Sequence, residues 1–279
     1  MDAGLLKAFL EVHRSRHFGR AAQNLFISQS AVSARIKQLE DELGIKLFSR
    51  ERNNIDLTTA GKKFLIYAEK ILNTWNKARL EISIPEDAET LLSVAALPSL
   101  WDIFLDNWLS WIHKSKFTTA LQVDVMQPDS LMRNLLDGTV DLGFVFDPPK
   151  TPEILVKKLL PVPLMMISTK QGLMAEEAIK DNYVYVDWGT EFAMIHARQY
   201  QDIPPPRLRA SVGRIALSFI NNCGGVAYLP EALVHDQLGA TLFPVVDAPV
   251  INKDAYAIFS YKSSKIETID RVLGWFEKS

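Results

Sequence analysis

The chain has 279 residues, of which 48% are apolar and 23% charged, with a net charge of −2 and one cysteine, Cys223. This balance excludes a disordered or fibrous protein, the single cysteine excludes an intrachain disulfide, and no apolar run approaches the roughly 20 residues that span a bilayer. We therefore expect two or three domains in the cytoplasm, with no secretory leader and no membrane as a partner.

The start of the chain is predicted to form three helices. Apolar side chains at helical spacing indicate a first helix over residues 3–14, and a second over 18–25 has paired alanines that allow close packing. Ser28 suits the N-cap of a third helix over 29–43, which Gly44 would end. Two helices, a turn and a third helix indicate a helix-turn-helix, whose last helix enters the major groove of DNA.

The outward face of the third helix carries hydrogen-bonding side chains in place of the Glu/Lys mixture of a merely solvated surface. Glutamine and arginine can read base edges, while serine and lysine bond phosphates. The alternative is that Ser28 and Ser30 only cap the helix and that Arg35 is only solvated. The DNA contacts predicted on this helix are Ser28, Gln29, Ser30, Ser33, Arg35 and Lys37.

Two short apolar runs with a polar tip between them follow the third helix. Residues 45–57 are therefore predicted to form a hairpin, which would be a wing beside the third helix. Side chains at its base or tip would lie near DNA phosphates. The predicted contacts on the wing are Arg50, Arg52 and Asn53.

Residues 58–83 are predicted to form one long helix, roughly 38 Å long at ~1.5 Å per residue. A narrow apolar seam, with spacings alternating between four and three, is typical of a two-stranded coiled coil, and lysines lie outside it. Packing of this helix on its own domain is the alternative. The predicted dimerisation seam is Phe64, Ala68, Ile71, Trp75, Ala78 and Ile82.

Charge is distributed unevenly along the chain. Residues 1–84 hold 14 basic and 9 acidic side chains, a net charge of +5, whereas the remainder holds 17 basic and 24 acidic ones, a net charge of −7. A basic head on an acidic body favours a polyanion as the partner of the head alone. Ordinary compositional scatter is the alternative.

The remaining two hundred residues follow a polar, proline-broken hinge at 85–89. Strand-like runs alternate there with helical stretches, which predicts an α/β domain with mainly parallel sheets. Strands are expected at 91–97, 121–126, 142–146, 164–168, 183–186, 207–212, 225–228 and 256–260. Helices are expected at 100–113, 130–136, 214–222, 230–238 and 265–276.

No sequence pattern in the chain points to catalysis. It has no GxSxG, GxGxxG, P-loop or HExxH pattern, and its five histidines lack metal-ligand spacing. We expect no catalytic residue, no cofactor and no metal. An enzyme on the α/β half is a remote alternative, since Cys223 as a nucleophile would need a His and an acid beside it. An architectural DNA-binding protein is another alternative, although the acidic body would oppose wrapping of DNA.

About sixty residues at the start of the chain fill most positions of a known signature. These are Phe9, Phe18-Gly19-Arg20-Ala21-Ala22, Leu25, Ser28-Gln29-Ser30-Ala31-Val32-Ser33, Ile36, Leu39-Glu40, Leu43-Gly44, Leu47-Phe48, Arg50, Leu57-Thr58 and Ala60-Gly61. The run resembles the LysR-type transcriptional regulators, and the stretch from Arg16 to Ala22 is most similar to the HdfR-like members. Gly19-Arg20 departs from the Thr or Ser that many members carry, which leaves the capping of the second helix open.

The resemblance implies an α+β multidomain protein. A winged helix-turn-helix would span 1–58, a linker and dimerisation helix 59–84, and an effector-binding domain 90–279 with two α/β lobes, as in type 2 periplasmic binding proteins. Lobe one would be 90–162 plus 255–279, and lobe two 163–254. The family binds operator DNA sequence-specifically as a dimer or tetramer, under control of a small-molecule effector and with RNA polymerase as a partner of activators. A ligand-independent regulator is the alternative.

The effector would bind where α/β sheets bind their ligands, beyond the C-terminal ends of strands and at helix N-termini. The junction at 96–101 is such a place, although Ser99 could serve only as a helix cap. By resemblance, the loops at 127–129 and 188–190 face the same cleft, and glycines at 224–225 would allow close backbone approach. The predicted effector contacts are Ser99, Leu100, Trp101, Gln127, Asp129, Trp188, Thr190, Cys223 and Gly224.

Overall fold

A computed structural model describes residues 2–51, 54–84, 88–115, 117–201 and 204–277 of the chain. The chain divides into two compact units, Met1–Ile84 and Pro85–Ser279, called here the first and the second unit. Within the described ranges, no helix has both the length and the apolar character needed to cross a membrane.

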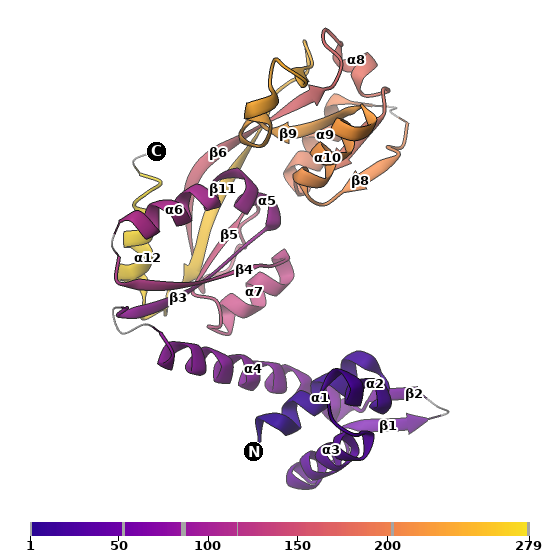
Figure 1. Ribbon diagram of the computed structural model, residues 1–279, viewed down its shortest axis with the longest axis vertical. Helices are drawn as coiled ribbons and strands as arrows, with labels where there is room; N and C mark the ends of the chain where they lie inside the picture. Colours follow the sequence, from indigo (N-terminus) through magenta and orange to yellow (C-terminus); the bar gives the residue numbers. More distant parts are fainter. Residues whose placement is uncertain (1, 52–53, 85–87, 116, 202–203, 278–279) are drawn as a thin grey trace. The chain divides into compact units, whose positions relative to one another are not determined.

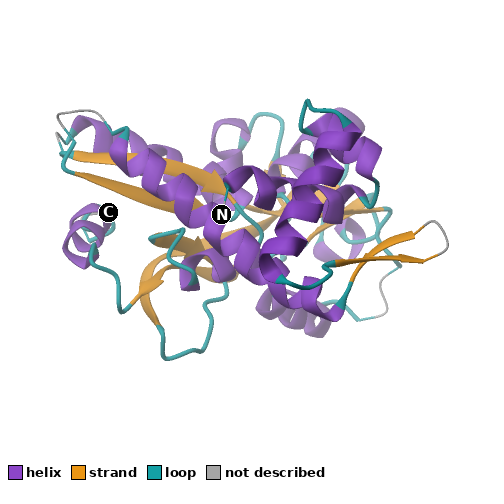
Figure 2. Cartoon of the chain, turned by 90° about the horizontal axis from the view of Figure 1, so that it is seen from below, coloured by secondary structure: helices purple, strands orange, loops and turns teal. Residues whose placement is uncertain are grey.

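The first unit contains the predicted three helices, α1 (Ala3–Ser15), α2 (Phe18–Asn24) and α3 (Gln29–Leu43) (Figure 1). The hairpin of β1 (Phe48–Glu51) and β2 (Asn54–Leu57) follows, and Figure 2 shows it projecting from the helices. The long helix α4 (Thr59–Ile82) ends the unit. These elements form the expected winged helix-turn-helix with a long following helix.

Each of these helices begins at a side chain that satisfies free backbone N–H groups. Ser28 and Thr58 cap α3 and α4 by accepting from Ala31 N and Gly61 N. The cap of α2, which the sequence left open, is His17, whose Nδ1 accepts from Gly19 N at 3.0 Å and Arg20 N at 3.2 Å. An imidazole nitrogen therefore does here what a Ser or Thr hydroxyl does at other helix starts.

The core of the first unit joins α1, α4 and the wing. The Phe9 ring lies 5.3 Å from that of Phe48 in β1 and 5.2 Å from that of Phe64 in α4, centroid to centroid. A Cβ added to Gly61 would lie 2.2 Å from the carbonyl oxygen of Leu47, so only glycine lets α4 start against the wing.

The second unit is built on one nine-stranded mixed sheet with the order β4-β3-β5-β11-β6-β9-β7-β8, and β10 (Phe243–Pro244) pairs with β6. One parallel group comprises β3 (Thr90–Ala96), β4 (Thr119–Val125) and β5 (Leu142–Val145). The other comprises β7 (Tyr183–Val186), β8 (Leu208–Ala210) and β9 (Val226–Pro230). The long antiparallel strands β6 (Ile154–Ser168) and β11 (Ile251–Ser260) join the groups.

Helices cover both faces of the first parallel group. The segments α5 (Pro98–Leu100), π-helical η1 (Trp101–Leu105) and α6 (Asp106–Lys114) follow one another, and Trp108 Nε1 donates to the Val272 carbonyl of α12 (Ile266–Leu273) at 2.8 Å. The other face packs against α7 (Pro128–Leu136) through a separate apolar cluster (Figure 1). We call this group with its helices lobe one.

The second parallel group and its helices form lobe two. Its helices are α8 (Ala175–Ala178), α9 (Thr190–Gln199), α10 (Gly213–Cys223), α11 (Glu231–Val234) and the 3-10 turn η2 (His235–Gln237). Beside its sheet lies a buried polar cluster, in which the Tyr183 hydroxyl meets His196 Nε2 at 2.8 Å. Burial and the nearby Arg209 charge lower the pKa of His196 to about 4, so this imidazole is neutral near pH 7.

The prediction of an α/β unit is confirmed, but the expectation of a mainly parallel sheet is corrected. The sequence indicated a strand only from residue 164 and another only from 256, whereas β6 begins at Ile154 and β11 at Ile251. Pro161 and Pro163 argue against a strand because proline cannot donate to the ladder. The strands continue past them, with a register irregularity between Asp254 and Tyr256 opposite this stretch.

Candidate DNA-binding and ligand-binding sites

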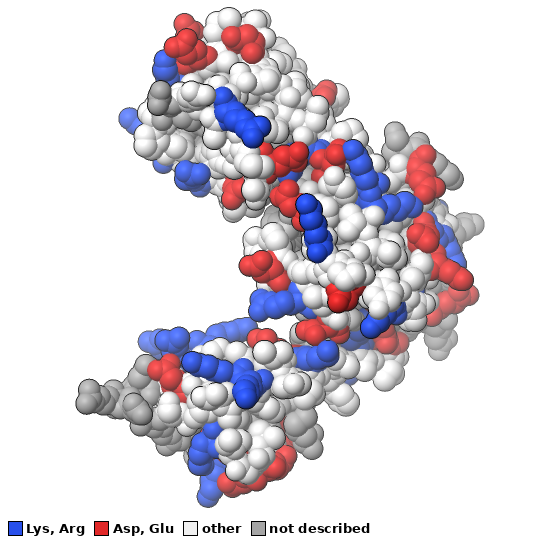
Figure 3. Space-filling model, turned by 180° about the vertical axis from the view of Figure 1, so that it is seen from behind, with Lys and Arg blue, Asp and Glu red and all other residues white. Residues whose placement is uncertain are grey.

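The outward face of α3 gathers most of the predicted DNA contacts. Val32, Ile36 and Leu39 face the core of the first unit. Ser30, Ser33 and Lys37 follow one another at i, i+3 and i+7, which places them on one side of the helix, where Ser30 and Lys37 are exposed and Ser33 is half-buried. Figure 3 shows that Lys and Arg side chains lie over this unit on the face displayed there.

Two of the predicted α3 contacts, Ser28 and Arg35, differ from the others: Ser28 also caps the helix, and Arg35 lies on another side of it. The Ser28 hydroxyl accepts from Ala31 N at 3.2 Å and meets the Ser30 hydroxyl at 2.9 Å, so Ser28 caps the helix whether or not it touches DNA. Arg35 is half-buried on the opposite flank of the apolar stripe from Gln29 and Ser33. Arg35 and the Ser30–Lys37 side can therefore reach different parts of a groove.

The wing is attached to α3 by one buried carboxylate. Glu40 of α3 accepts from Leu47 N at 2.8 Å and Phe48 N at 3.3 Å, and Lys46 Nζ donates to it at 2.7 Å. Burial raises the pKa of Glu40, but the hydrogen bonds that it accepts outweigh burial and hold the pKa below its usual range. In the wing itself, the backbone of Arg50 pairs with Ile55. Arg52 and Asn53 lie outside the described residues.

The predicted dimerisation seam divides into two halves. Ala68 has no exposed surface and the Phe64 ring packs on Phe9, so the first half of the seam lies in the core of its own unit. For Ala68 the prediction is wrong, because α1 packs against this half of α4 and leaves the methyl group no surface for a partner. The second half is open: Trp75 is 54% exposed, Ile71 and Ile82 are exposed, and Ala78 is half-buried.

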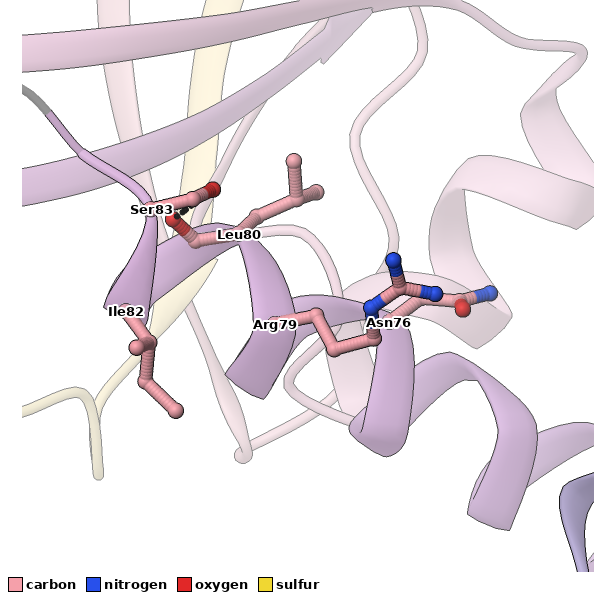
Figure 4. Close-up of a pocket in the computed structure, with 5 residues that line it drawn as sticks. All are labelled: Asn76, Arg79, Leu80, Ile82 and Ser83. Carbon is pink, nitrogen blue, oxygen red and sulfur yellow. Dashed lines mark hydrogen bonds between the residues drawn. The ribbon is translucent and has the colours of Figure 1, made fainter.

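Two hollows accompany this open half of α4. Ile71, Leu72 and Trp75 line one of about 310 Å³ together with the start of α1. The last turns of α4 form another of about 560 Å³, where the Ser83 hydroxyl donates to the Leu80 carbonyl at 3.1 Å (Figure 4). The residues lining this second hollow are Asn76, Arg79, Leu80, Ile82 and Ser83.

The second unit has a cleft between its lobes, formed by adjoining cavities of about 590 and 180 Å³. It lies where the C-terminal ends of β3 and β5 in lobe one face those of β7 and β8 in lobe two. Such an edge leaves helix N-termini open to a ligand, as at α7 and α9 here. Four of the predicted effector contacts line the cleft: Ser99, Gln127, Trp188 and Thr190.

The other five predicted contacts do not line these cavities. Leu100 has no exposed surface, Trp101 packs against the apolar core, and Asp129 is exposed beside the cleft. Cys223 and Gly224 precede β9, which runs parallel to β7, so they lie at the opposite edge of the sheet. The glycine there serves the local turn, since the Asn182 side chain donates to the Gly224 carbonyl at 2.7 Å.

Several residues of the cleft were not predicted from the sequence. Asp147 lies two residues after β5 and Asp187 directly follows β7, so the same strand-end rule would have found them. Arg209 lies within β8, with its guanidinium carbon 4.4 Å from the centroid of the Tyr185 ring. Strand register brings Arg209 next to Tyr185, because the two residues pair across β7 and β8.

A buried lysine lies next to the cleft. Lys253 of β11 has a fully buried side chain, with Nζ 2.8 Å from Asp147 Oδ1 in lobe one and 3.6 Å from Glu191 Oε2 in lobe two. A Cβ added to Gly189 would lie 2.1 Å from Asp147 Oδ2, so the lobes touch closely at this glycine. Within the described ranges, no group of three or more His, Cys, Asp or Glu side chains could hold a metal ion.

Comparison with known proteins gives matches along the whole chain. Residues 4–62 match the family model for bacterial regulatory helix-turn-helix proteins of the lysR family, and residues 85–278 match that for the LysR substrate binding domain. The HTH-type transcriptional regulator HdfR of Yersinia enterocolitica is 35% identical over 282 residues, covering 98% of this chain and 95% of that protein.

Solved structures of full length share the fold. The crystal structure of CbnR, a LysR family transcriptional regulator, has a TM-score of 0.76 at 19% identity and covers 100% of both chains. Full-length CbnR complexed with its target DNA has a TM-score of 0.72 at 21% identity, covering 100% of this chain and 99% of that one.

Proposed function

Because the chain belongs to the LysR family of DNA-binding transcriptional regulators, we propose that it recognises a specific operator through α3 and that a small molecule in the cleft modulates this binding. The resemblance seen in the sequence, to the family and to its HdfR-like members, is confirmed. The chain is a LysR-type regulator with an effector-binding domain, and its family is one of regulators rather than enzymes.

The polar, exposed side of α3 carries the proposal of sequence-specific binding. Its first turns present Gln29, Ser30 and Ser33, followed by Lys37. Serine and lysine bond phosphates and fix the register, while Gln29 and Arg35 are the side chains able to read base edges. Arg50, Arg52 and Asn53 of the wing would add phosphate contacts beside the groove.

We place the dimer contact on the open half of α4. Trp75, Ile71 and Ile82 are large apolar side chains exposed on α4 beyond the half that packs on its own unit, and a partner helix would bury them. A homodimer, or a tetramer of two such dimers, presents two recognition helices about one DNA turn, ~34 Å, or a multiple apart.

The cleft supplies the regulatory input in this proposal. A ligand that touches both lobes shifts the equilibrium between open and closed states. The size of that shift is set by the difference in its affinity for the two states. We expect the effector to meet Ser99, Gln127, Trp188 and Thr190, and RNA polymerase to be a further partner if the outcome is activation. The regulator works in the cytoplasm, carries out no catalysis and needs no cofactor.

Selection of DNA by the full-length protein tests the proposal. A library of random duplexes is passed over the protein through several rounds and sequenced. Enriched sequences should share two inverted half-sites separated by about one helical turn or a multiple of it. Enrichment of a common site that no ligand ever affects would favour a ligand-independent regulator, and binding without any enriched sequence would favour an architectural protein.

A further inference from the structure

Among the described residues, the cleft holds a carboxylate, Asp187, and a guanidinium, Arg209, that have no counter-ion. Asp187 accepts a hydrogen bond from Gly189 N at 3.0 Å, and Arg209 lies over the Tyr185 ring. In the part of the chain that the structure describes, neither side chain takes part in an ion pair. Both are exposed, and both line the larger cavity. The two groups are thus available to a ligand.

Tyr185 is close enough to both charges to be influenced by each. Burial raises the pKa of Tyr185, the Asp187 carboxylate raises it further, and the Arg209 guanidinium lowers it, so both charges act on the same phenol. Register explains the placement, since Tyr185 and Arg209 are paired across β7 and β8 and Asp187 follows two residues later. The carboxylate and the guanidinium therefore occupy neighbouring positions on the lobe-two wall of the cleft.

The other charges near the cleft already have partners. Lys253 Nζ is shared between Asp147 and Glu191 at 2.8 and 3.6 Å. A ligand ammonium would gain little from Asp147, because the lysine neutralises it, and would meet an unshared carboxylate only at Asp187. A ligand carboxylate would find an unshared cation at Arg209, with the N-terminus of α9 at Thr190 adding a favourable dipole.

Apolar side chains form much of the remaining cleft wall, beside the polar Ser99, Gln127 and Thr190. Leu97, Val145 and Phe146 contribute from lobe one, and Trp188 and Ala193 from lobe two. A cavity of about 590 Å³ is in the range that encloses a small ligand. Such a wall favours a ligand with one hydrocarbon part and with its charges gathered at one end.

We propose that the cleft binds a small zwitterion of the α-amino-acid kind with an apolar side chain, its ammonium on Asp187 and its carboxylate on Arg209. The proposal rests on the effector role proposed for the cleft and adds the chemical class of the ligand. A simple carboxylate would pair with Arg209 but be repelled by Asp187. A simple amine would pair with Asp187 but be repelled by Arg209. Only a ligand with both charges satisfies both groups.

Matched analogues test this on the full-length protein. Thermal unfolding is followed with apolar α-amino acids from alanine to phenylalanine, and with the amine and the carboxylic acid of the same skeleton. For leucine these are 3-methylbutylamine and 4-methylpentanoate. At least one amino acid should raise the Tm in a saturable way, and its Kd should be about tenfold or more below those of its two analogues.

Substitutions then assign the two contacts. Arg209→Gln and Asp187→Asn should each abolish the preference for the zwitterion, the first making the amine and the second making the acid the better ligand. Arg207→Gln is the matched control, because Arg207 is exposed two residues away and does not line the cleft, so the response should persist. The melting curve of each variant without ligand reports whether the variant folds. If a variant does not fold, the comparison of amino acid, amine and acid on the wild type still tests the proposal.

The outcomes separate this proposal from the proposed function. Binding of the acid or the amine as tightly as the amino acid, or no Tm response to any amino acid, would overturn the zwitterion. Random-duplex selection on the same preparation tests the regulator itself: a common enriched site leaves the proposed function standing when the zwitterion fails, whereas failure of both overturns it as well.

Discussion

A buried charged side chain lies next to the functional elements of each unit, Glu40 beside the wing and Lys253 beside the cleft, and the two are held in different ways. Glu40 receives two backbone N–H groups at the start of the wing, so its partners are themselves buried. Lys253 bridges Asp147 and Glu191, whose side chains are 51% and 59% exposed. In the first unit, buried N–H groups thus rely on the Glu40 carboxylate as their acceptor. In the second unit, the carboxylates next to the cleft can be solvated by water instead.

This difference indicates which unit is built to be rigid. Buried N–H groups without an acceptor are costly, so α3 and the wing are fixed relative to each other. Lys253 has one carboxylate partner on each lobe, and both carboxylates are more than half exposed. When the lobes separate, the lysine can therefore keep one partner while the other is solvated, so this contact opposes separation only weakly. A rigid DNA reader and an adjustable cleft are what the proposed regulator requires.

Glu40→Met should have the largest effect among the variants considered. It removes the acceptor of two buried N–H groups, which we expect to cost about 3 kcal/mol of the free energy of unfolding of the head. Hydrogen exchange of the amides around Leu47 and Phe48 measures it. Glu42→Met is the control, because Glu42 is exposed and bonds only to Gln38 among the described contacts. Equal protection in both variants would show that Glu40 does not hold the wing.

Acid should weaken the second unit before the first. The folded pKa of His196 is about 4 and its unfolded value 6.5, so the unfolded state gains a proton first as the pH falls. Stability present above pH 6.5 should therefore decrease towards pH 4, by up to about 3 kcal/mol. Glu40, with its lowered pKa, has stability to lose only below about pH 4.3.

The pH effect is measured by urea unfolding of the wild type and of His196→Gln between pH 7 and 4. The variant should lack the decrease assigned to this group. An unchanged pH dependence in the variant would place the acid sensitivity elsewhere in the unit.

Arg35→Ala should weaken binding to the selected operator by about 1–3 kcal/mol, with little change on a scrambled duplex. Gln38→Ala on the exposed side of α3 is the control. Fluorescence anisotropy gives both affinities. An equal loss on the two duplexes would make Arg35 a phosphate contact, and no loss would remove it from the interface.

Trp75→Lys should raise the dimer Kd by about tenfold or more, or ~1.4 kcal/mol, without unfolding the chain, since Trp75 is already 54% exposed. Thr74→Lys adds the same charge one position away from the seam and should leave the dimer intact. Sedimentation velocity over a concentration series separates the two. Intact dimers of Trp75→Lys would reject this half of α4 as the interface.

Lys253→Met should have the smallest effect, within about 1 kcal/mol of the wild type, because it leaves no buried group without a partner. Urea unfolding of the second unit measures it, and Glu40→Met is the natural comparison. A loss as large as that of Glu40→Met would contradict the difference drawn between the two units.

The sequence predicted the head more fully than the cleft, for a physical reason. The helices, wing and capping residues of the head come from local spacing within sixty residues, so Ser28, Gly44 and Thr58 indicated boundaries close to those observed. The cleft is made by strand order. Asp147, Arg209 and Lys253 lie far apart in sequence and meet only because β5, β8 and β11 join one sheet.

The misses follow the same rule. Cys223 and Gly224 were assigned to the cleft by their glycine-rich context, but the direction of β9 puts them at the other edge. The spacing of Ala68 fits a heptad seam and a core position equally well. Periodicity alone cannot tell whether the helix packed against it belongs to a partner or is α1 of the same chain. Helix α9 was not predicted, and only its first residue, Thr190, was assigned a role, although Phe192 and His196 of this helix are buried in lobe two.

The central claim is that this head reads a DNA sequence, and one binding experiment tests it most directly. Full-length protein is titrated by fluorescence anisotropy against DNA from upstream of its own gene and against a scrambled duplex, over a salt series. The account predicts a preference of about a thousandfold or more for the specific duplex, persisting as salt weakens both. Equal affinities at every salt concentration, for this duplex and for any duplex enriched by selection, would contradict it.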